Sequence, residues 1–248
     1  QLGRTDRQGT KRFIAFFIFV ESLLWLFAVR HEFSLQRELP WAANYMIRSM
    51  SIYPVGTLVS ARTAWEEQSV LDGSDLCSPL EVASDVPLHQ YMGILGPTGM
   101  TAWIGLFEIG QPKPGETVVV SAAGGAVGTV VGQLAKAEGC RVIGLTSTRD
   151  KADWLEGDVG YDVVIDRETQ PDLAGALRAA CPDGVDIFFD NVGGEALDTV
   201  MSQLREQARL VLCGAISQYE SAVQPLNNSW ELITKRARME GFMFSDYF

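Results

Sequence analysis

The sequence predicts an α/β fold in which a parallel sheet is covered by helices on both faces. The chain has 248 residues, and its 47% hydrophobic content is ample for a core. From residue 117 onward, short segments rich in Val, Ile, Leu or Phe alternate with segments of helical periodicity. The first apolar segment ends in a glycine-rich turn that leads directly into a helix pattern. This order is typical of a doubly wound sheet of six strands.

The expected elements follow one another in a regular alternation. Each expected strand is short and bounded by Gly, Asp or Pro. The expected strands are 117–122, 141–146, 161–166, 185–191, 208–214 and 239–244. The expected helices are 126–138, 150–156, 171–180, 195–205 and 229–237. The strand–helix–strand connections of such a sheet should be right-handed.

The glycine-rich turn within 118–128 (VVVSAAGGAVG) is the strongest indication of a ligand. A strand brings the chain to the edge of the sheet, and the glycines allow backbone to approach a phosphate. The following helix then offers free N–H groups and the positive end of its dipole. The turn predicts a site for a dinucleotide pyrophosphate, and the alternative is a strand–helix–strand unit without a ligand.

The tip of the second strand indicates which dinucleotide would bind. NAD sites usually place Asp or Glu about 20 residues after the glycines. Here that region carries Thr146, Ser147 and Thr148, followed by the cations Arg149 and Lys151. Hydroxyls and cations suit a 2′-phosphate, which favours NADP(H) over NAD(H). An inward-pointing Asp150 or a solvated helix start would weaken this prediction.

Composition narrows the functional classes. The formal charge of −11 does not favour a nucleic-acid partner. The four cysteines, at positions 77, 140, 181 and 213, form no CxxC pair. With only His31 and His89 in addition, no zinc-ligand spacing is present, so we expect no metal. Scattered cysteines suit a reduced, cytoplasmic protein.

Several motifs resemble the medium-chain dehydrogenase/reductase superfamily. Within it, they are similar to the zinc-independent, NADP-dependent alkenal double-bond reductases and prostaglandin reductases (leukotriene B4 12-hydroxydehydrogenase type). The resemblance covers about 55–248 and includes a Rossmann turn. The motifs are 99–103 (GMTAW), 122–128 (AAGGAVG), 131–136 (VGQLAK), 189–194 (FDNVGG), 213–219 (CGAISQY) and 238–242 (RMEGF).

This resemblance implies NADPH-dependent reduction of the C=C bond of α,β-unsaturated carbonyls such as alkenals, enones and 15-keto prostaglandin-like lipids. The resemblance also implies which residues bind the cofactor, and Thr148 is added to them because of its place at the tip of the second strand. The expected cofactor-binding residues are Thr101, Gly125, Ala126, Val127, Gly128, Thr148, Lys151, Arg167, Asn191, Cys213, Gly214, Ala215, Ile216, Ser217, Phe242 and Phe244.

Tyr219 is the expected catalytic residue. Hydride addition to the β-carbon places negative charge on the carbonyl oxygen as an enolate. A tyrosine hydroxyl is neutral at pH 7 and can donate a hydrogen bond, or pass a proton, to that oxygen. The alternative is a tyrosine that only packs in a turn.

The sequence departs from the family pattern in four places. Arg167 replaces a tyrosine or similar residue after the third strand, where it could hold a 2′-phosphate by charge. Gly124 replaces a small polar residue or alanine before Gly125. The family sequences continue beyond the position of Phe248. The first 50 residues do not read as the usual β-rich catalytic domain, and a Tyr45–Met46 pair is only a weak match to a substrate-site motif.

The segment 13–29 is unlike the remainder of the chain. Fifteen of its 17 residues are apolar, with Glu21 and Ser22 as the interruptions. Residues 1–50 carry a formal charge of +3, whereas the rest carries −14. Three explanations remain: a divergent or mis-assembled N-terminus, a helix packed on the sheet, or a membrane anchor. A mid-span Glu and the short length argue against the anchor.

These observations predict three parts: a divergent or aberrant segment 1–54, a remnant of a GroES-like catalytic domain at 55–92, and a C-terminally truncated Rossmann domain at 93–248. The expected partners are a small enal or enone substrate and a second copy that pairs through the last strand, 239–244. We expect neither nucleic acid nor membrane as a partner. The alternatives are an NADPH-binding fragment without catalysis and a quinone reductase of the same superfamily.

Overall fold

The computed structural model describes residues 41–46, 54, 56–63, 76–220 and 222–247. The chain divides into two compact units, Gln1–Thr98 and Gly99–Phe248, each of which is described by itself. The apolar segment 13–29 and the three explanations for it lie outside the described residues. Among the described residues, no helix is long and apolar enough to cross a membrane.

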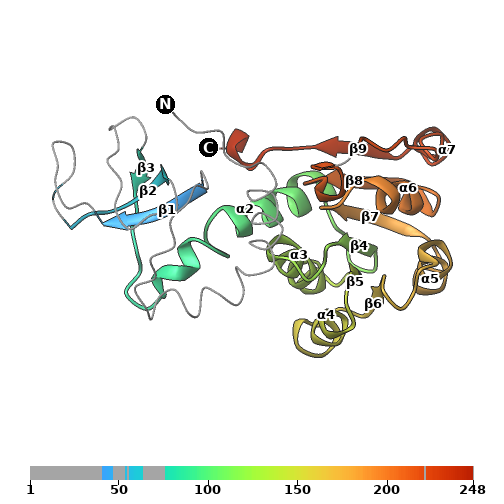
Figure 1. The fold of residues 1–248 in the computed structure, drawn as a ribbon, viewed down its shortest axis with the longest axis horizontal. Helices are drawn as coiled ribbons and strands as arrows, with labels where there is room; N and C mark the ends of the chain where they lie inside the picture. The colour runs from blue at the N-terminus through green and yellow to red at the C-terminus, as the bar shows by residue number, and fades with distance from the viewer. Residues whose placement is uncertain (1–40, 47–53, 55, 64–75, 221, 248) are drawn as a thin grey trace. The chain divides into compact units, whose positions relative to one another are not determined.

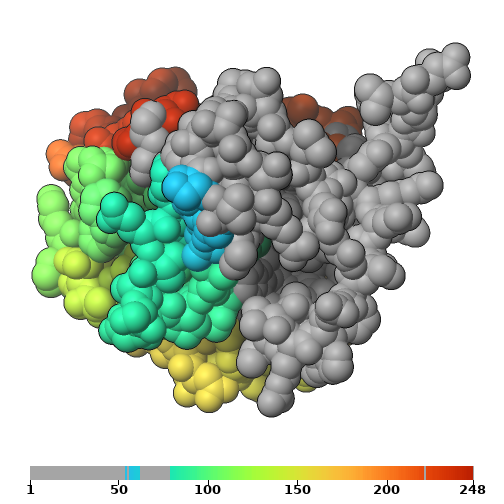
Figure 2. Space-filling model, turned by 90° about the vertical axis from the view of Figure 1, so that its left-hand side faces the viewer, coloured from blue at the N-terminus to red at the C-terminus, as the bar shows by residue number. Residues whose placement is uncertain are grey.

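The first unit contains a three-stranded antiparallel sheet in the order β1-β2-β3. Its strands are β1 (Trp41–Met46), β2 (Leu58–Thr63) and β3 (Leu76–Pro79). Val59 and Ala61, two residues apart on β2, are both buried, as expected for one face of a strand. A short 3₁₀ turn, η2 (Leu88–Tyr91), follows. Figure 2 shows part of the described surface of this unit, coloured blue to turquoise.

The second unit contains a six-stranded parallel sheet in the order β6-β5-β4-β7-β8-β9. The strands are β4 (Thr117–Ser121), β5 (Arg141–Thr146), β6 (Val163–Asp166), β7 (Val185–Asp190), β8 (Leu204–Leu212) and β9 (Arg238–Gly241). The predicted doubly wound α/β fold is therefore confirmed. The strand order reverses between β4 and β7, which is where such sheets bind ligands.

Helices cover both faces of this sheet (Figure 1). The longer ones are α2 (Pro97–Trp103), continued by the π-helical η3 (Ile104–Gly110), then α3 (Ala126–Ala137), α4 (Arg149–Trp154) with the π turn η4 (Leu155–Val159), α5 (Leu173–Ala180) and α6 (Gly194–Met201). Short helical segments are η5 (Ile216–Gln218), α7 (Glu231–Thr234) and η6 (Phe244–Tyr247).

Each face of the sheet carries its own buried cluster. Val118 and Val120 of β4 pack with α3, α4 and η3, whereas Val119 packs with α5 and α6. Successive residues of a strand point to opposite faces, so both faces of these strands must be apolar. This explains why the sequence shows continuous apolar runs rather than alternation.

Several expected boundaries were wrong. The helix expected at 195–205 ends at Met201, and β8 begins at Leu204 instead of 208. The first part of β8 carries the exposed polar residues 205–207, and Gln207 has a positive φ of 61°. This part of the strand therefore does not show the alternation of apolar and polar residues that predicts a strand. The helix expected at 229–237 is the four-residue α7, because the chain turns at Arg236 with φ 51°. The last strand ends at Gly241 rather than 244. The helix over 97–110 was not predicted.

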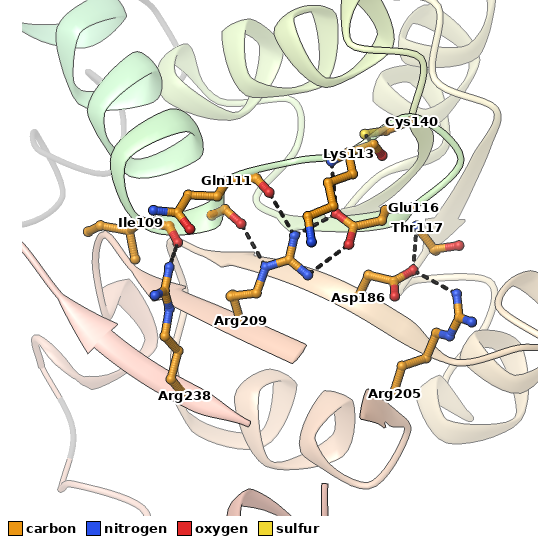
Figure 3. A network of polar contacts seen from close by, with 11 residues as sticks. Ile109, Gln111, Lys113, Glu116, Thr117, Cys140, Asp186, Arg205, Arg209 and Arg238 are labelled. Atoms are coloured by element: carbon orange, nitrogen blue, oxygen red, sulfur yellow. Dashed lines mark hydrogen bonds and ion pairs between the residues drawn. The ribbon is translucent and has the colours of Figure 1, made fainter. Parts of the chain in front are cut away.

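The amino ends of the strands are joined by a polar network around Arg209 of β8 (Figure 3). Its guanidinium donates to the carbonyl oxygens of Gly110 (2.7 Å) and Gln111 (2.9 Å) and makes two contacts with the Glu116 carboxylate (2.9 and 2.5 Å). Arg238 donates to the carbonyl oxygen of Ile109. The cations thereby satisfy carbonyl groups at the C-terminal end of η3, which helices leave without partners.

Candidate cofactor site at the carboxyl ends of the strands

The predicted glycine turn lies at the carboxyl end of β4, beside the reversal of strand order. Ala122 has a positive φ of 47°, and its carbonyl oxygen accepts from the N–H of Gly125 (2.9 Å). Gly125 is the N-cap of α3 and offers no side chain to the first N–H groups of the helix. A helix start of this kind can bind an anion through those groups and the helix dipole. The structure therefore brings Gly125, Ala126, Val127 and Gly128 together at one helix start.

Gly128 allows α3 to lie directly on the turn. A Cβ atom at this position would lie 2.5 Å from the carbonyl oxygen of Ala122 and 2.8 Å from Cα of Ala123. These atoms belong to the backbone and cannot move aside cheaply. A glycine is required here by close packing of the helix on the strand, as in dinucleotide-binding turns.

Lys151 of α4 lies over the same turn. Its side-chain carbons Cδ, Cβ and Cγ would be 3.1, 3.5 and 3.5 Å from a Cβ atom placed at Gly124. Gly124, a departure from the family pattern, thus provides room for the lysine. Burial lowers the pKa of Lys151 below its ordinary value. The predicted cation is therefore positioned at the glycine turn.

The neighbours of Lys151 are arranged differently. Thr148 is the N-cap residue of α4, and its side chain makes no capping hydrogen bond. Arg149 is ion-paired with Asp153 one turn along the helix, at 2.6 Å, and both side chains are 58% exposed. The two cations expected near a 2′-phosphate are thus split: Lys151 lies at the turn, and Arg149 pairs along its own helix.

Arg167 follows β6, and its backbone N–H donates to the carbonyl oxygen of Thr146 (3.0 Å). Its guanidinium is ion-paired with Glu195 in the first turn of α6, at 3.0 Å. The Nε atom of Arg167 is buried and has no hydrogen-bond partner. An unsatisfied donor of this kind in a native structure calls for an explanation, such as a ligand.

Asn191 lies across the reversal point from the glycine turn. Its backbone N–H donates to Oγ of Ser121 (2.8 Å), and its side-chain amide donates to the Ser121 carbonyl oxygen (2.8 Å). The Ser121 hydroxyl in turn donates to the carboxylate of Asp190 (2.7 Å). The ends of β4 and β7 are therefore tied together by side chains.

The loop 213–219 follows β8 and carries Tyr219. The N–H groups of Cys213 and Gly214 donate to the carbonyl oxygen of Asp190 (2.8 and 3.1 Å). Burial raises the pKa of the Cys213 thiol to about 12, so it is not a reactive thiolate at neutral pH. The Tyr219 hydroxyl accepts from the N–H of Ala215 (3.2 Å), and the side chain is 51% exposed.

Three expected site residues lie outside this loop, and one of them is close to its start: β8 and β9 pair up to Leu212 and Gly241, and Cys213 and Phe242 pack against the same core cluster. Phe242 packs on Gly105 beside the ring of Phe189, in the core cluster of η3 and β7. Phe244 begins the turn η6, and Thr101 lies half-buried in α2. Their predicted roles at the cofactor remain predictions.

Sequence reasoning missed four residues that shape the site: Ser121, Tyr161, Asp190 and Glu195. Asp190 stands in the FDNVGG motif, but no role was assigned to it. Ser121 is a polar residue at the end of a buried apolar run, which is a usable signal. The contacts of Tyr161 and Glu195 join segments far apart in sequence and left no local pattern.

No group of three His, Cys, Asp or Glu side chains in the described parts of the chain could hold a metal ion. At the turn itself, the start of α3 offers backbone N–H groups without a capping side chain, and the Lys151 side chain lies beside Gly124. That donor set suits a phosphorylated ligand better than a cation.

Comparisons with known proteins agree with this geometry. The sequence profile of the family described as zinc-binding dehydrogenase matches residues 126–247. The chain is 45% identical over 194 residues to the 2-alkenal reductase (NADP(+)-dependent) of Nicotiana tabacum, covering 78% of this chain and 56% of that protein. It is 44% identical over 196 residues to prostaglandin reductase 1 of Oryctolagus cuniculus, covering 78% of this chain and 56% of that protein.

The structure is similar to that of CurA from Vibrio vulnificus in complex with NADPH. The TM-score is 0.70 at 40% sequence identity, covering 79% of this chain and 59% of that one. The fold and the turn place the chain among the medium-chain dehydrogenases/reductases. Within that superfamily, the chain belongs to the zinc-independent family of alkenal and prostaglandin reductases. It spans little more than half the length of these curated relatives.

Proposed function

We propose that this chain binds NADPH and serves an NADP-dependent reduction of the C=C bond of α,β-unsaturated carbonyls. The observation that carries the proposal is the position of Lys151 directly over the glycine turn at the start of α3. The names of the relatives support it: 2-alkenal reductase, prostaglandin reductase 1 and, in Mentha piperita, (+)-pulegone reductase. Alkenals and enones are accordingly the proposed substrate class.

The residues at the turn fit a phosphorylated dinucleotide. The start of α3 has no capping side chain on its first N–H groups, and Gly128 lets this helix lie directly on the turn. We assign the pyrophosphate to residues 125–128 and the 2′-phosphate to Lys151 and Thr148. Arg167, with its unpartnered Nε, would add a second cation if its guanidinium moved from Glu195 to the phosphate.

NADPH, when bound, supplies the hydride for the reduction. The chain's own contribution is to hold the nicotinamide end near Asn191 and the loop 213–217, and to place the Tyr219 hydroxyl where a substrate oxygen becomes negative. A hydrogen bond from that hydroxyl would stabilise the developing charge, and the hydroxyl could pass a proton to the oxygen. Preorganised donors of this type typically contribute about 10²–10³-fold to the rate.

The test is a fluorescence titration with NADPH and with NADH, followed by a turnover assay with a 2-alkenal and a cyclic enone. We expect tighter binding of NADPH and oxidation of NADPH that depends on the enone. Tyr219→Phe should bind NADPH normally and lose about 10²-fold in kcat. Tyr247→Phe, a comparably exposed tyrosine in η6, is the control and should leave kcat unchanged.

The outcomes separate the alternatives. Absence of NADPH binding would contradict the proposal as a whole. Binding without consumption by any enone would leave a nucleotide-binding chain without catalysis, and preferential turnover of a quinone would identify a quinone reductase. Full activity in Tyr219→Phe would remove the tyrosine from the mechanism and leave the cofactor site intact.

We also propose a homodimer that joins two sheets at β9. β9 pairs with β8 and is the last strand in the sheet order, and such an edge is prone to pair with another chain. Met243, just beyond β9, is 62% exposed, and Trp230, before α7, is 66% exposed. Sedimentation equilibrium should show a dimer, and Met243→Lys should weaken it. A monomer at high concentration would contradict the proposal.

A further inference from the structure

A buried carboxylate, that of Asp190, lies at the centre of the strand ends. The residue is 0% exposed, and its carboxylate accepts from the Ser121 hydroxyl (2.7 Å) and from the N–H groups of Val192 (2.9 Å) and Gly193 (3.0 Å to each oxygen). Burial raises the pKa of Asp190, and these hydrogen bonds oppose that rise. Because all of these partners are hydrogen-bond donors, they satisfy the carboxylate in its ionised form.

These hydrogen bonds hold the turn that joins β7 to α6. Gly193 and Gly194 have positive φ values of 70° and 57°, which favour glycine. A Cβ at Gly193 would lie 3.0 Å from Nε2 of Gln218 and 3.2 Å from Cβ of Ala215. The turn is thus the surface against which the loop 213–219 packs.

The loop is attached to the carbonyl oxygens of the same turn. The backbone carbonyl oxygen of Asp190 accepts from the N–H groups of Cys213 and Gly214. The backbone carbonyl oxygen of Asn191 accepts from the N–H of Ile216 (3.3 Å). The Val192 oxygen accepts from both the N–H (3.1 Å) and the Oγ (2.7 Å) of Ser217. Three successive carbonyl groups, beginning with that of Asp190, therefore set the course of the loop.

The loop ends at the candidate catalytic residue, Tyr219. The Tyr219 hydroxyl is held to the loop through the N–H of Ala215, at 3.2 Å. A shift of the turn would move this hydroxyl with the loop. A misplacement of about 1 Å in a reacting group can cost about 10²-fold in rate.

We propose that Asp190 is the positioning residue of this site: its carboxylate fixes the turn 191–194 and, through the loop 213–219, the place of the Tyr219 hydroxyl. The inference rests on the proposed function for its consequence in catalysis. Asp190 acts through Tyr219 and touches neither substrate nor cofactor. Ser121 completes the arrangement, because its hydroxyl joins Asp190 to Asn191.

Asp190→Asn is the direct test. The N–H of Gly193 donates to both carboxylate oxygens of Asp190. In either orientation of the asparagine amide, its NH₂ group, which is a donor, would therefore face this N–H, which is also a donor. Hydrogen exchange of the cofactor-free protein should be faster by about tenfold at the amides of Cys213, Gly214, Ile216 and Ser217, with α3 unchanged. Exchange as slow as in the wild type at these four amides overturns the proposal, whatever the turnover.

Kinetics provide the second readout. We expect Asp190→Asn to lower kcat by about tenfold or more with little change in NADPH affinity. Combined with Tyr219→Phe, it should lower kcat no further, because both changes act on the same hydroxyl. A full additional loss in the double variant overturns the proposal. Faster exchange in a protein that shows no enone turnover would support the positioning role and contradict the proposed function.

Two further variants keep the test decisive. Asp186→Asn alters another buried carboxylate at the opposite end of β7, which accepts from Thr117 and Arg205. It should destabilise the fold without accelerating exchange in 213–219 relative to α3, and such acceleration would overturn the assignment. Should Asp190→Asn not fold, Ser121→Ala removes one donor, and a smaller acceleration at the same amides is expected. No acceleration in Ser121→Ala would then count against the proposal.

Discussion

The hydroxyl of Tyr161 donates a hydrogen bond to the carbonyl oxygen of Gly128 at 2.7 Å, connecting the segment before β6 to the first turn of α3. Tyr161 is 4% exposed, and burial raises the pKa of its hydroxyl far above the ordinary value, so the group remains a donor. The tyrosine ring also occupies the space beside Gly132 on the next turn of α3. One buried side chain therefore sets the position of the helix whose N-terminus forms the candidate phosphate site.

We expect Gly132→Ala to destabilise the protein by about 1–3 kcal/mol. The new Cβ would lie 2.2–2.4 Å from atoms of the Tyr161 ring, which is enclosed and cannot move aside. Gly157→Ala is the control, since nothing lies within 4 Å of its Cβ position, and it should change stability by less than about 0.5 kcal/mol. Urea denaturation of both variants measures the difference, and equal stabilities would contradict the packing described here.

Replacing Lys151 by Met should weaken NADPH binding by about 10- to 100-fold and leave NADH binding nearly unchanged. The reason is that only the 2′-phosphate distinguishes the two cofactors, and Lys151 lies at the glycine turn. Lys113→Met, which removes an exposed cation before β4 at the opposite edge of the sheet, is the matched control. Equal losses for NADPH and NADH would show that the lysine does not read the 2′-phosphate.

Arg209→Met should cost about 3–5 kcal/mol of stability, because it leaves the Glu116 carboxylate without its partner in a poorly solvated place. The two side chains are only 13% and 16% exposed. Arg236 and Glu206 form a second pair, at 56% and 71% exposure, so Arg236→Met should cost about 0–1 kcal/mol. Thermal and chemical denaturation compare the two, and a similar effect of both changes would be inconsistent with the burial of the first pair.

The stability of the protein in acid should depend on Glu116. Burial acts to raise the pKa of this carboxyl, but the hydrogen bond from Arg209, that from the Lys113 N–H and the nearby positive charges lower it below its ordinary value. A depressed pKa stabilises the fold above the unfolded-state pKa, and this contribution is lost as pH falls through the folded-state pKa. Between about pH 5 and pH 3, the wild type should therefore lose more stability than Glu116→Gln. Parallel acid profiles for the two proteins would contradict this.

Local sequence patterns were sufficient for most of the sheet. The apolar runs that became β4, β5 and β7 are buried on both faces, and their composition alone identifies strands. The glycine turn was equally readable, because close approach of backbone restricts the residue type at Gly128. The boundaries around β8 and α7 were less accessible, since Gln207 and Arg236 adopt positive φ values that their residue types do not announce.

The candidate site was predictable only in part. The position of Lys151 over Gly124 agrees with the charge pattern at the tip of the second strand. The pairing of Arg167 with Glu195 and the packing of Phe242 on Gly105 were not expected, because they join segments 28 and more than 100 residues apart. Asp190 is part of the FDNVGG motif, but the positioning role proposed for it rests on the hydrogen-bond donors that surround its carboxylate.

The sequence by itself determined the fold class, the cofactor turn and the residues that could carry charge or protons. These depend on local periodicity, on backbone sterics and on side-chain chemistry, all of which are encoded within a few neighbouring residues. The tertiary structure alone decided which polar groups meet at the strand ends. Hydrogen bonds such as those from Ser121 and Gly193 to Asp190 exist because parallel strands distant in sequence end at the same edge of the sheet.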